Sequence, residues 1–268
     1  VDQFRAFFTH QRITAGIIAA GSKPRNIVIT MHQKPDGDAM GSTLGLYHFL
    51  HNGGHQVTVI SPTNWADFLD WMPGVDKVLN FEANKEKCLS LLDKAEILFC
   101  LDFNIFHRTK HLAPHLASAK AIKVLIDHHE QPDEVNFHYG ISDTGKSSTC
   151  EMVYDFITDS GHANKINLDV AACLYTGLMT DTGSFRFPST TASVHRMIAF
   201  FKDLGLKHTP IHDNIYDNFL ENRLRFIGFV LNNRMEVMYE YNTAIMYVYR
   251  NDLQKFDIKT GDTEGLVN

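Results

Sequence analysis

The stretch Asn26–Ser42, NIVITMHQKPDGDAMGS, predicts both the start of the fold and the place where its chemistry lies. Its first residues, 26–31, are mostly β-branched and apolar, which is typical of a buried strand. We expect the remainder, His32–Ser42, to form a loop, because proline and glycine interrupt it. Three side chains of this loop can bind a cation: His32, Asp36 and Asp38.

Outward from this stretch, strand-like and helix-like segments alternate along the chain. Apolar residues recur with helical spacing from Leu44 to Leu50, and Gly53-Gly54 ends that helix. Gly37 and Gly41 are expected to make the preceding loop tight. Further strands are expected at 56–60, 97–101 and 121–126, and further helices at 84–94, 147–159 and 167–180. This alternation predicts an α/β fold with a mainly parallel sheet flanked by helices.

Acidic residues follow three of the expected strands and one expected helix. They are Asp36 and Asp38 after 26–31, Asp102 after 97–101, Asp127 with His128 and His129 after 121–126, and Asp181 after 167–180. The carboxyl ends of strands in an open α/β sheet border one crevice, so we expect these side chains to converge. Taken singly, each acid is more often a turn residue or a helix cap. The four positions together indicate one shared site.

Carboxylates cannot crowd into a small site without cations, because like charges repel. Hard divalent metals bind carboxylate and imidazole together, and added histidine moves the preference from Mg²⁺ toward Mn²⁺, Fe²⁺ or Zn²⁺. None of the four cysteines lies in these motifs, which argues against structural zinc. Two metals ~3.5–4 Å apart would suit in-line displacement at phosphorus.

Composition limits the range of partners. Lys and Arg total 25 and Asp and Glu total 31, so the net charge of −6 disfavours binding of long duplex nucleic acid. No apolar run reaches the ~18 residues of a transmembrane helix, so no membrane partner is expected. The cysteines form no C-x-x-C pair and indicate a reduced, cytoplasmic protein.

The pattern changes after Thr191. Helices are expected at 2–20, 191–205 and 222–233, and a hairpin is expected with strands 235–241 and 244–250 around Asn242-Thr243. We therefore expect a catalytic domain at 1–205, a linker at 206–224, and part of a smaller α/β C-terminal domain at 225–268.

The motifs also match a known family. His32-x-x-x-Asp36-x-Asp38, Asp102, Asp127-His128-His129 and Asp181-Thr182-Gly183 together resemble the DHH phosphoesterase superfamily. Within it, Pro35–Ser42 and Asp181–Arg186 look most like the nanoRNase branch, often described as exopolyphosphatase-related. Family II pyrophosphatases share the D-x-D and D-H-H features, but their basic Ser-Arg-Lys-Lys-type segment is not found in this sequence.

The resemblance implies a role for each matching residue. His32 and Asp36 resemble ligands of a first metal, and Asp38, His128 and Asp181 resemble ligands of a second, with Asp102 bridging both. A hydroxide held between the ions would be the nucleophile. His129 would stabilise charge on the scissile phosphate, and Asp127 would orient a histidine ring. For Arg108 and for Arg186, a contact with phosphate and a surface position are equally favoured alternatives.

By the same resemblance, the chain would hydrolyse short single-stranded RNA (nanoRNA) to mononucleotides and remove the 3′-phosphate of adenosine 3′,5′-bisphosphate (pAp). The cofactors would be two Mn²⁺, with Mg²⁺ or Co²⁺ as alternatives. Alternative functions are hydrolysis of the linear dinucleotide pApA, then pyrophosphatase or exopolyphosphatase activity, then non-catalytic nucleotide binding. A homodimer is left open. The family's Gly-Gly-Gly-His segment is absent, so we expect that the sequence stops within its second domain.

Overall fold

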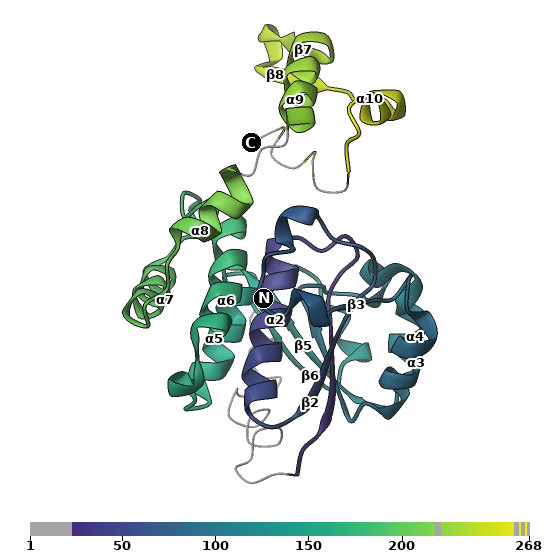
Figure 1. Cartoon of the computed structure of the whole chain (residues 1–268), viewed down its shortest axis with the longest axis vertical. Coiled ribbons are helices and arrows are strands. Elements are labelled where there is room, and N and C mark those ends of the chain that lie inside the picture. Colours follow the sequence, from purple (N-terminus) through teal and green to yellow (C-terminus); the bar gives the residue numbers. More distant parts are fainter. Residues whose placement is uncertain (1–22, 218–220, 260–262, 264–265, 267–268) are drawn as a thin grey trace.

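The computed structural model describes residues 23–217 and 221–259, together with Thr263 and Leu266 (Figure 1). The helix expected at 2–20 lies outside these residues. Within the described part of the chain, no helix combines the length and the apolar character needed to cross a membrane.

A six-stranded sheet forms the centre of the fold. Its strands are β1 (Asn26–Thr30), β2 (Gln56–Ser61), β3 (Leu79–Asn80), β4 (Ile97–Leu101), β5 (Ile122–Asp127) and β6 (Tyr139–Ser142). Every neighbouring pair is parallel, in the order β3-β2-β1-β4-β5-β6. The predicted parallel α/β sheet is therefore confirmed.

Helices cover both faces of this sheet (Figure 1). On one face lie α2 (Gly37–Asn52), α5 (Thr149–Asp159) and α6 (Leu168–Asp181), with α7 (Ala192–Asp203) packed outside them. On the other lie α3 (Lys85–Lys94) and α4 (Ala113–Ser118). Short 3₁₀ turns occupy Asp67–Leu69, Val75–Lys77, Phe106–Leu112, Glu134–Asn136 and Ala163–Lys165.

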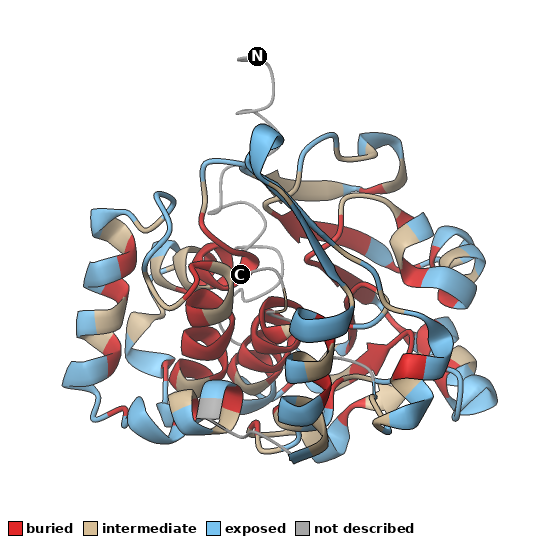
Figure 2. Cartoon of the chain, turned by 90° about the horizontal axis from the view of Figure 1, so that it is seen from above, coloured by how far each residue is buried: buried red, intermediate tan, exposed pale blue. Residues whose placement is uncertain are grey.

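The sheet separates two hydrophobic cores. Phe99 of β4 packs into the core under α2, α5 and α6, whereas Leu98 and Cys100 pack into the core under α3 and α4. All of β4 is buried, as expected for a central parallel strand covered on both faces. Figure 2 shows the result, with buried residues in the strands and inner helices and exposed residues on the outer helix faces.

The loop expected at 32–42 is wrong in its second half, because α2 already begins at Gly37. The side chain of Asp36 accepts hydrogen bonds from the backbone N–H groups of Asp38 (3.1 Å) and Ala39 (3.0 Å). This capping satisfies amides that a helix start leaves open, so the helix can begin directly after the proline.

Glycine also acts differently from expectation, since Gly41 lies within α2 and allows close helix packing. A Cβ atom on Gly41 would lie 2.5 Å from the carbonyl oxygen of Cys173 on α6. A Cβ atom on Gly177 of α6 would lie 2.7 Å from the Cα of Asp38. The backbones of α2 and α6 therefore approach to a distance that only glycine permits at these positions.

Two edge strands, β3 and β6, escape prediction from the sequence. β3 is two residues long, and β6 has the sequence YGIS, so neither carries a strong strand signal. They are strands because β2 and β5 offer parallel partners to them.

The C-terminal elements follow α8 (Thr209–His212) and a π-helical turn (Asp213–Asp217), both within the expected linker. They are α9 (Glu221–Asn233), β7 (Met235–Met238), β8 (Thr243–Met246) and α10 (Arg250–Lys255). The strands pair antiparallel, so the hairpin is present. It is shorter than predicted, because Tyr239–Tyr241 form a 3₁₀ turn and Asn242 turns the chain with φ 45°. The assignment of 225–268 to a second domain stays a prediction.

Substitution of Gly177 by alanine tests the close helix packing. We expect Gly177→Ala to lower the free energy of unfolding by about 1–3 kcal/mol, because the new methyl group meets backbone that cannot move aside. Gly228 provides the matched control, since it also lies within a helix but a Cβ there meets nothing within 4 Å. Gly228→Ala should stabilise by about 0.5–1 kcal/mol. Chemical denaturation measures both, and equal effects would contradict this interpretation.

Candidate metal centre

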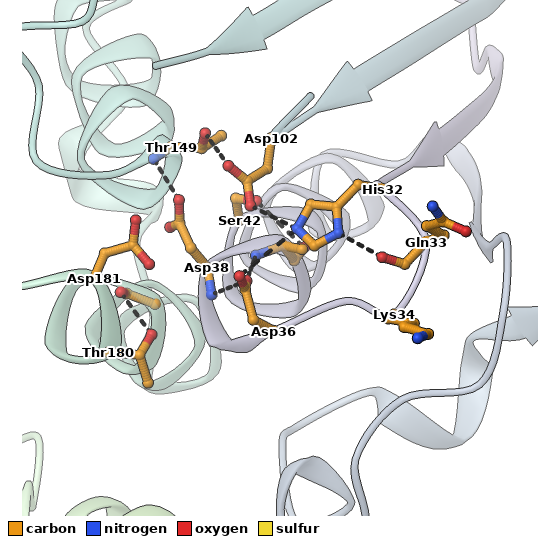
Figure 3. Close-up of polar contacts among 12 residues, drawn as sticks. His32, Gln33, Lys34, Asp36, Asp38, Ser42, Asp102, Thr149, Thr180 and Asp181 are labelled. Carbon is orange, nitrogen blue, oxygen red and sulfur yellow. Dashed lines mark hydrogen bonds and ion pairs between the residues drawn. The ribbon is translucent and has the colours of Figure 1, made fainter. Parts of the chain in front are cut away.

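The candidate site lies where the strand order reverses direction. β1 and β4 are neighbours, although β2 and β3 lie between them in sequence. Such switch points form the ligand crevice of open α/β sheets. His32 follows β1 and Asp102 follows β4, while α2 begins and α6 ends beside them (Figure 3).

A first ligand group consists of His32, Asp36 and Asp102. The Nε2 atom of His32 lies 3.4 Å from Asp102 Oδ2 and 3.7 Å from Asp36 Oδ2. Its Nδ1 atom lies 2.8 Å from the carbonyl oxygen of Gln33. Because a carbonyl only accepts, Nδ1 is the donor, and a neutral ring presents the Nε2 lone pair to the carboxylates.

A second ligand group consists of Asp38, His128 and Asp181. The Nε2 atom of His128 lies 3.4 Å from Asp181 Oδ2, 3.5 Å from Asp102 Oδ1 and 3.8 Å from Asp38 Oδ2. Ligands ~2.1 Å from one ion lie about 3–3.5 Å apart in octahedral or tetrahedral geometry. The donor atoms of both groups therefore have spacings suited to divalent metals.

Asp102 is a member of the first group and also contacts His128 of the second. Its Oδ2 atom faces His32 and its Oδ1 atom faces His128, as a carboxylate bridging two ions requires. The residue is 2% exposed and has φ 63°, a left-handed conformation that is unfavourable for aspartate. Its N–H donates to the carbonyl of Ile126 (3.2 Å), which fixes it at the strand end. Strain of this kind is concentrated at functional sites.

Asp38 is held by the N-terminus of α5. Its Oδ2 accepts from the N–H of Thr149 (2.6 Å) and its Oδ1 accepts from the N–H of Cys150 (2.9 Å). The sequence motifs that contain the ligands do not predict this support. The available signal was Ser148 with Glu151 three residues later, a spacing typical of a helix N-terminus, and Ser148 Oγ does accept from the N–H of Glu151 (3.1 Å).

The acids carry more negative charge than the buried site tolerates. Burial raises the pKa of Asp38 to about 8, with a further contribution from Asp102. Burial and the charges of Asp38 and Asp102 raise the pKa of Asp181 to about 10. Near neutral pH the metal-free site therefore holds protons on carboxylates that would otherwise be ionised.

The histidines respond in the opposite sense. Burial lowers the pKa of His32, but hydrogen bonding to Asp102 and Asp36 outweighs it and raises the pKa to about 10. For His128, burial is likewise outweighed, chiefly by Asp102, and the pKa rises to about 9. Burial also opposes the ionisation of Asp102, yet His128 and His32 hold its pKa below the usual range. The pKa shifts of the acids and of the histidines all favour added positive charge in the site, so this donor set fits metal cations.

His129 differs from His128 in its partner. Its Nδ1 lies 2.7 Å from Oδ1 of the fully buried Asp127, whereas the distance from Nδ1 to Asp102 Oδ1 is longer, at 3.7 Å. Asp102, His128 and His129 are also close enough to form a third group. However, the bond to Asp127 occupies Nδ1 of His129, which argues against ligation through that atom. The contact of Asp127 with a histidine ring has the form expected of an orienting residue.

Arg108 is not brought into this cluster by any side-chain contact. Its carbonyl oxygen accepts from the N–H of Gln33 (2.8 Å), but its guanidinium makes no hydrogen bond or ion pair with a residue in the described ranges. Arg186 is exposed, and its Nε donates to the carbonyl of Gly183 (2.6 Å). Phosphate contact by either arginine stays a prediction.

Comparison with known proteins agrees with this geometry. Residues 26–178, more than half of the chain, match the model of the DHH family, N-terminal domain. The chain belongs to the DHH family. The matched range contains His32, Asp36, Asp38, Asp102 and the Asp127-His128-His129 motif. Asp181 lies three residues beyond it.

Similar proteins come from several bacteria. The chain is 25% identical to "Bifunctional oligoribonuclease and PAP phosphatase NrnA" of Bacillus subtilis, over 90% of this chain and 72% of the relative. It is 28% identical to the Thermus thermophilus protein of the same name, over 78% of this chain and 59% of the relative. A crystal structure of an exopolyphosphatase-related protein from Bacteroides fragilis is 37% identical, with a TM-score of 0.91 over 97% of this chain and 75% of that one.

Asp181 offers a test of metal binding that is separate from catalysis. Its pKa of about 10 means that it carries a proton at neutral pH without metal, so Asp181→Asn replaces a neutral group by a neutral group of similar shape. We expect the metal-free variant to melt at or above the wild-type temperature. Wild type should gain about 2.7 kcal/mol per ion when Mn²⁺ is present at 100 times the Kd of each site, and the variant should lose the contribution of the second ligand group.

The exposed Asp93 on α3 supplies the matched control, since Asp93→Asn should change neither quantity. Thermal melts with and without Mn²⁺ measure all three proteins. A full Mn²⁺ gain in Asp181→Asn would exclude this carboxylate as a ligand.

Proposed function

We propose that this chain is a divalent-metal phosphoesterase that hydrolyses short oligoribonucleotides to mononucleotides and removes the 3′-phosphate of pAp, with Mn²⁺ as its metal. The observation that carries the proposal is the position of the Asp102 carboxylate, which belongs to the first ligand group and contacts His128 of the second. The names of the Bacillus and Thermus relatives support the substrate class.

In this proposal His32 and Asp36 hold one ion, Asp38, His128 and Asp181 hold a second, and Asp102 contacts both. Two divalent ions would supply Lewis-acid chemistry and an activated water at neutral pH. The residues of the chain fix the distance between the two groups. The four carboxylates would balance the positive charge of two divalent ions at this site.

His129 has the geometry of a group that faces the substrate. Its Nδ1 donates to Asp127, so the tautomer is fixed and Nε2 is left for another partner. With a proton on Nε2 as well, the ring would donate a hydrogen bond to a phosphoryl oxygen as negative charge develops there. Its side chain is 35% exposed, so a substrate can reach it.

Turnover of a defined substrate set tests the proposal. Metal-free protein supplied with Mn²⁺ should hydrolyse diadenylate and short RNA to mononucleotides and release phosphate from pAp, and long duplex RNA should persist. Asp102→Ala should be inactive because the first ligand group loses a member and the second loses the carboxylate beside His128. Release of phosphate from pyrophosphate or polyphosphate alone would contradict the proposal and favour the other activities of the superfamily. Cleavage confined to pApA would favour the dinucleotidase alternative.

His129→Ala separates substrate contact from metal binding. We expect kcat to fall by about 10²-fold or more, the loss typical of one charge-stabilising donor. The metal content after gel filtration should equal that of wild type, because Nδ1 already has Asp127 as its partner. Loss of an ion, measured by elemental analysis, would show instead that His129 is a ligand.

A further inference from the structure

Thr149 contacts two carboxylates of the candidate metal centre, those of Asp38 and Asp102. Its N–H donates to Asp38 Oδ2 (2.6 Å) and its hydroxyl donates to Asp102 Oδ1 (3.0 Å), as Figure 3 shows. The same two oxygen atoms face Nε2 of His128, at 3.8 and 3.5 Å. Thr149 is fully buried and is the first residue of α5.

The first ligand group receives no such bond. It uses Asp102 Oδ2 and Asp36 Oδ2, neither of which accepts from Thr149 within the described part of the chain. Thr149 thus distinguishes the two oxygens of Asp102. Its hydroxyl donates to Oδ1, whereas Oδ2 faces His32 and receives no bond from Thr149. A carboxylate oxygen has two lone-pair directions, so a donor in one of them restricts a metal to the other.

We propose that Thr149 is a positioning residue that selectively sets the metal affinity of the group Asp38, His128 and Asp181, and not that of the group containing His32. This inference rests on the proposed two-metal function, and it assigns the two ions different supports. Partners that orient metal ligands usually contribute 10- to 100-fold to affinity. The helix N-terminus strengthens the effect, because its amides hold Asp38 through both oxygens.

Variants that retain only one of the two ligand groups make the selectivity measurable. Asp181→Asn disables the second group, and Asp36→Asn disables the first while retaining a good helix cap for α2. Thr149→Val removes the hydroxyl and keeps the backbone N–H and the side-chain volume. Mn²⁺ is titrated calorimetrically into metal-free protein for each combination.

We expect Thr149→Val to weaken Mn²⁺ binding by about 10- to 100-fold in the Asp36→Asn background. In the Asp181→Asn background the change should stay within about twofold, as for independent positions. Thr149→Ser keeps a hydroxyl and should restore most of the affinity. Thr158→Val is the matched control on the same helix, since that hydroxyl only donates within α5, to Tyr154 and Asp155.

Equal weakening in both backgrounds, or no weakening in either, would overturn the inference. So would failure of Thr149→Ser to recover affinity while its melting temperature equals that of wild type. If wild type binds two Mn²⁺ with the expected selectivity but does not hydrolyse short RNA or pAp, the inference stands and the proposed function fails. If wild type binds fewer than two Mn²⁺, both fail.

Discussion

Repulsion among Asp36, Asp38, Asp102 and Asp181 is the constraint on which the rest of the centre depends. The switch point between β1 and β4 collects these carboxylates within a few ångströms, and Asp38 and Asp102 are buried. Without cations, the raised pKa values of Asp38 and Asp181 show protons taking the place of positive charge. Repulsion among the four carboxylates is thus unfavourable until divalent metals or protons neutralise their charge.

Helix ends and close packing oppose this repulsion. The N-termini of α2 and α5 direct amides at Asp36 and Asp38, and partial positive charge at these ends favours carboxylates. α6 points the other way, so its C-terminal end adds negative potential beside Asp181 and further favours a cation. The glycine contact between α2 and α6 brings these opposite ends together. The packing of the helical layer therefore also determines the electrostatic potential at the site.

The sequence predicted what depends on local pattern. The strands 97–101 and 56–60 and the helix 167–180 agree closely with the structure, and so does the convergence of acids that follow strand ends. It did not predict the start of α2, because the cap by Asp36 competes with a proline and two glycines that suggest a loop. Nor did it find Thr149, whose role arises only from tertiary contacts with positions more than forty residues away.

The spread of the ligands along the chain has a kinetic consequence. His32 follows β1 and Asp181 ends α6, so elements far apart in the sequence must pack together before the two residues meet. An unfolded chain therefore offers no preformed site, and bound metal stabilises the native state by mass action. Contacts of such high sequence separation form late, so metal should slow unfolding while leaving the folding rate nearly unchanged. Bound metals would then lengthen the lifetime of the folded protein without accelerating its formation.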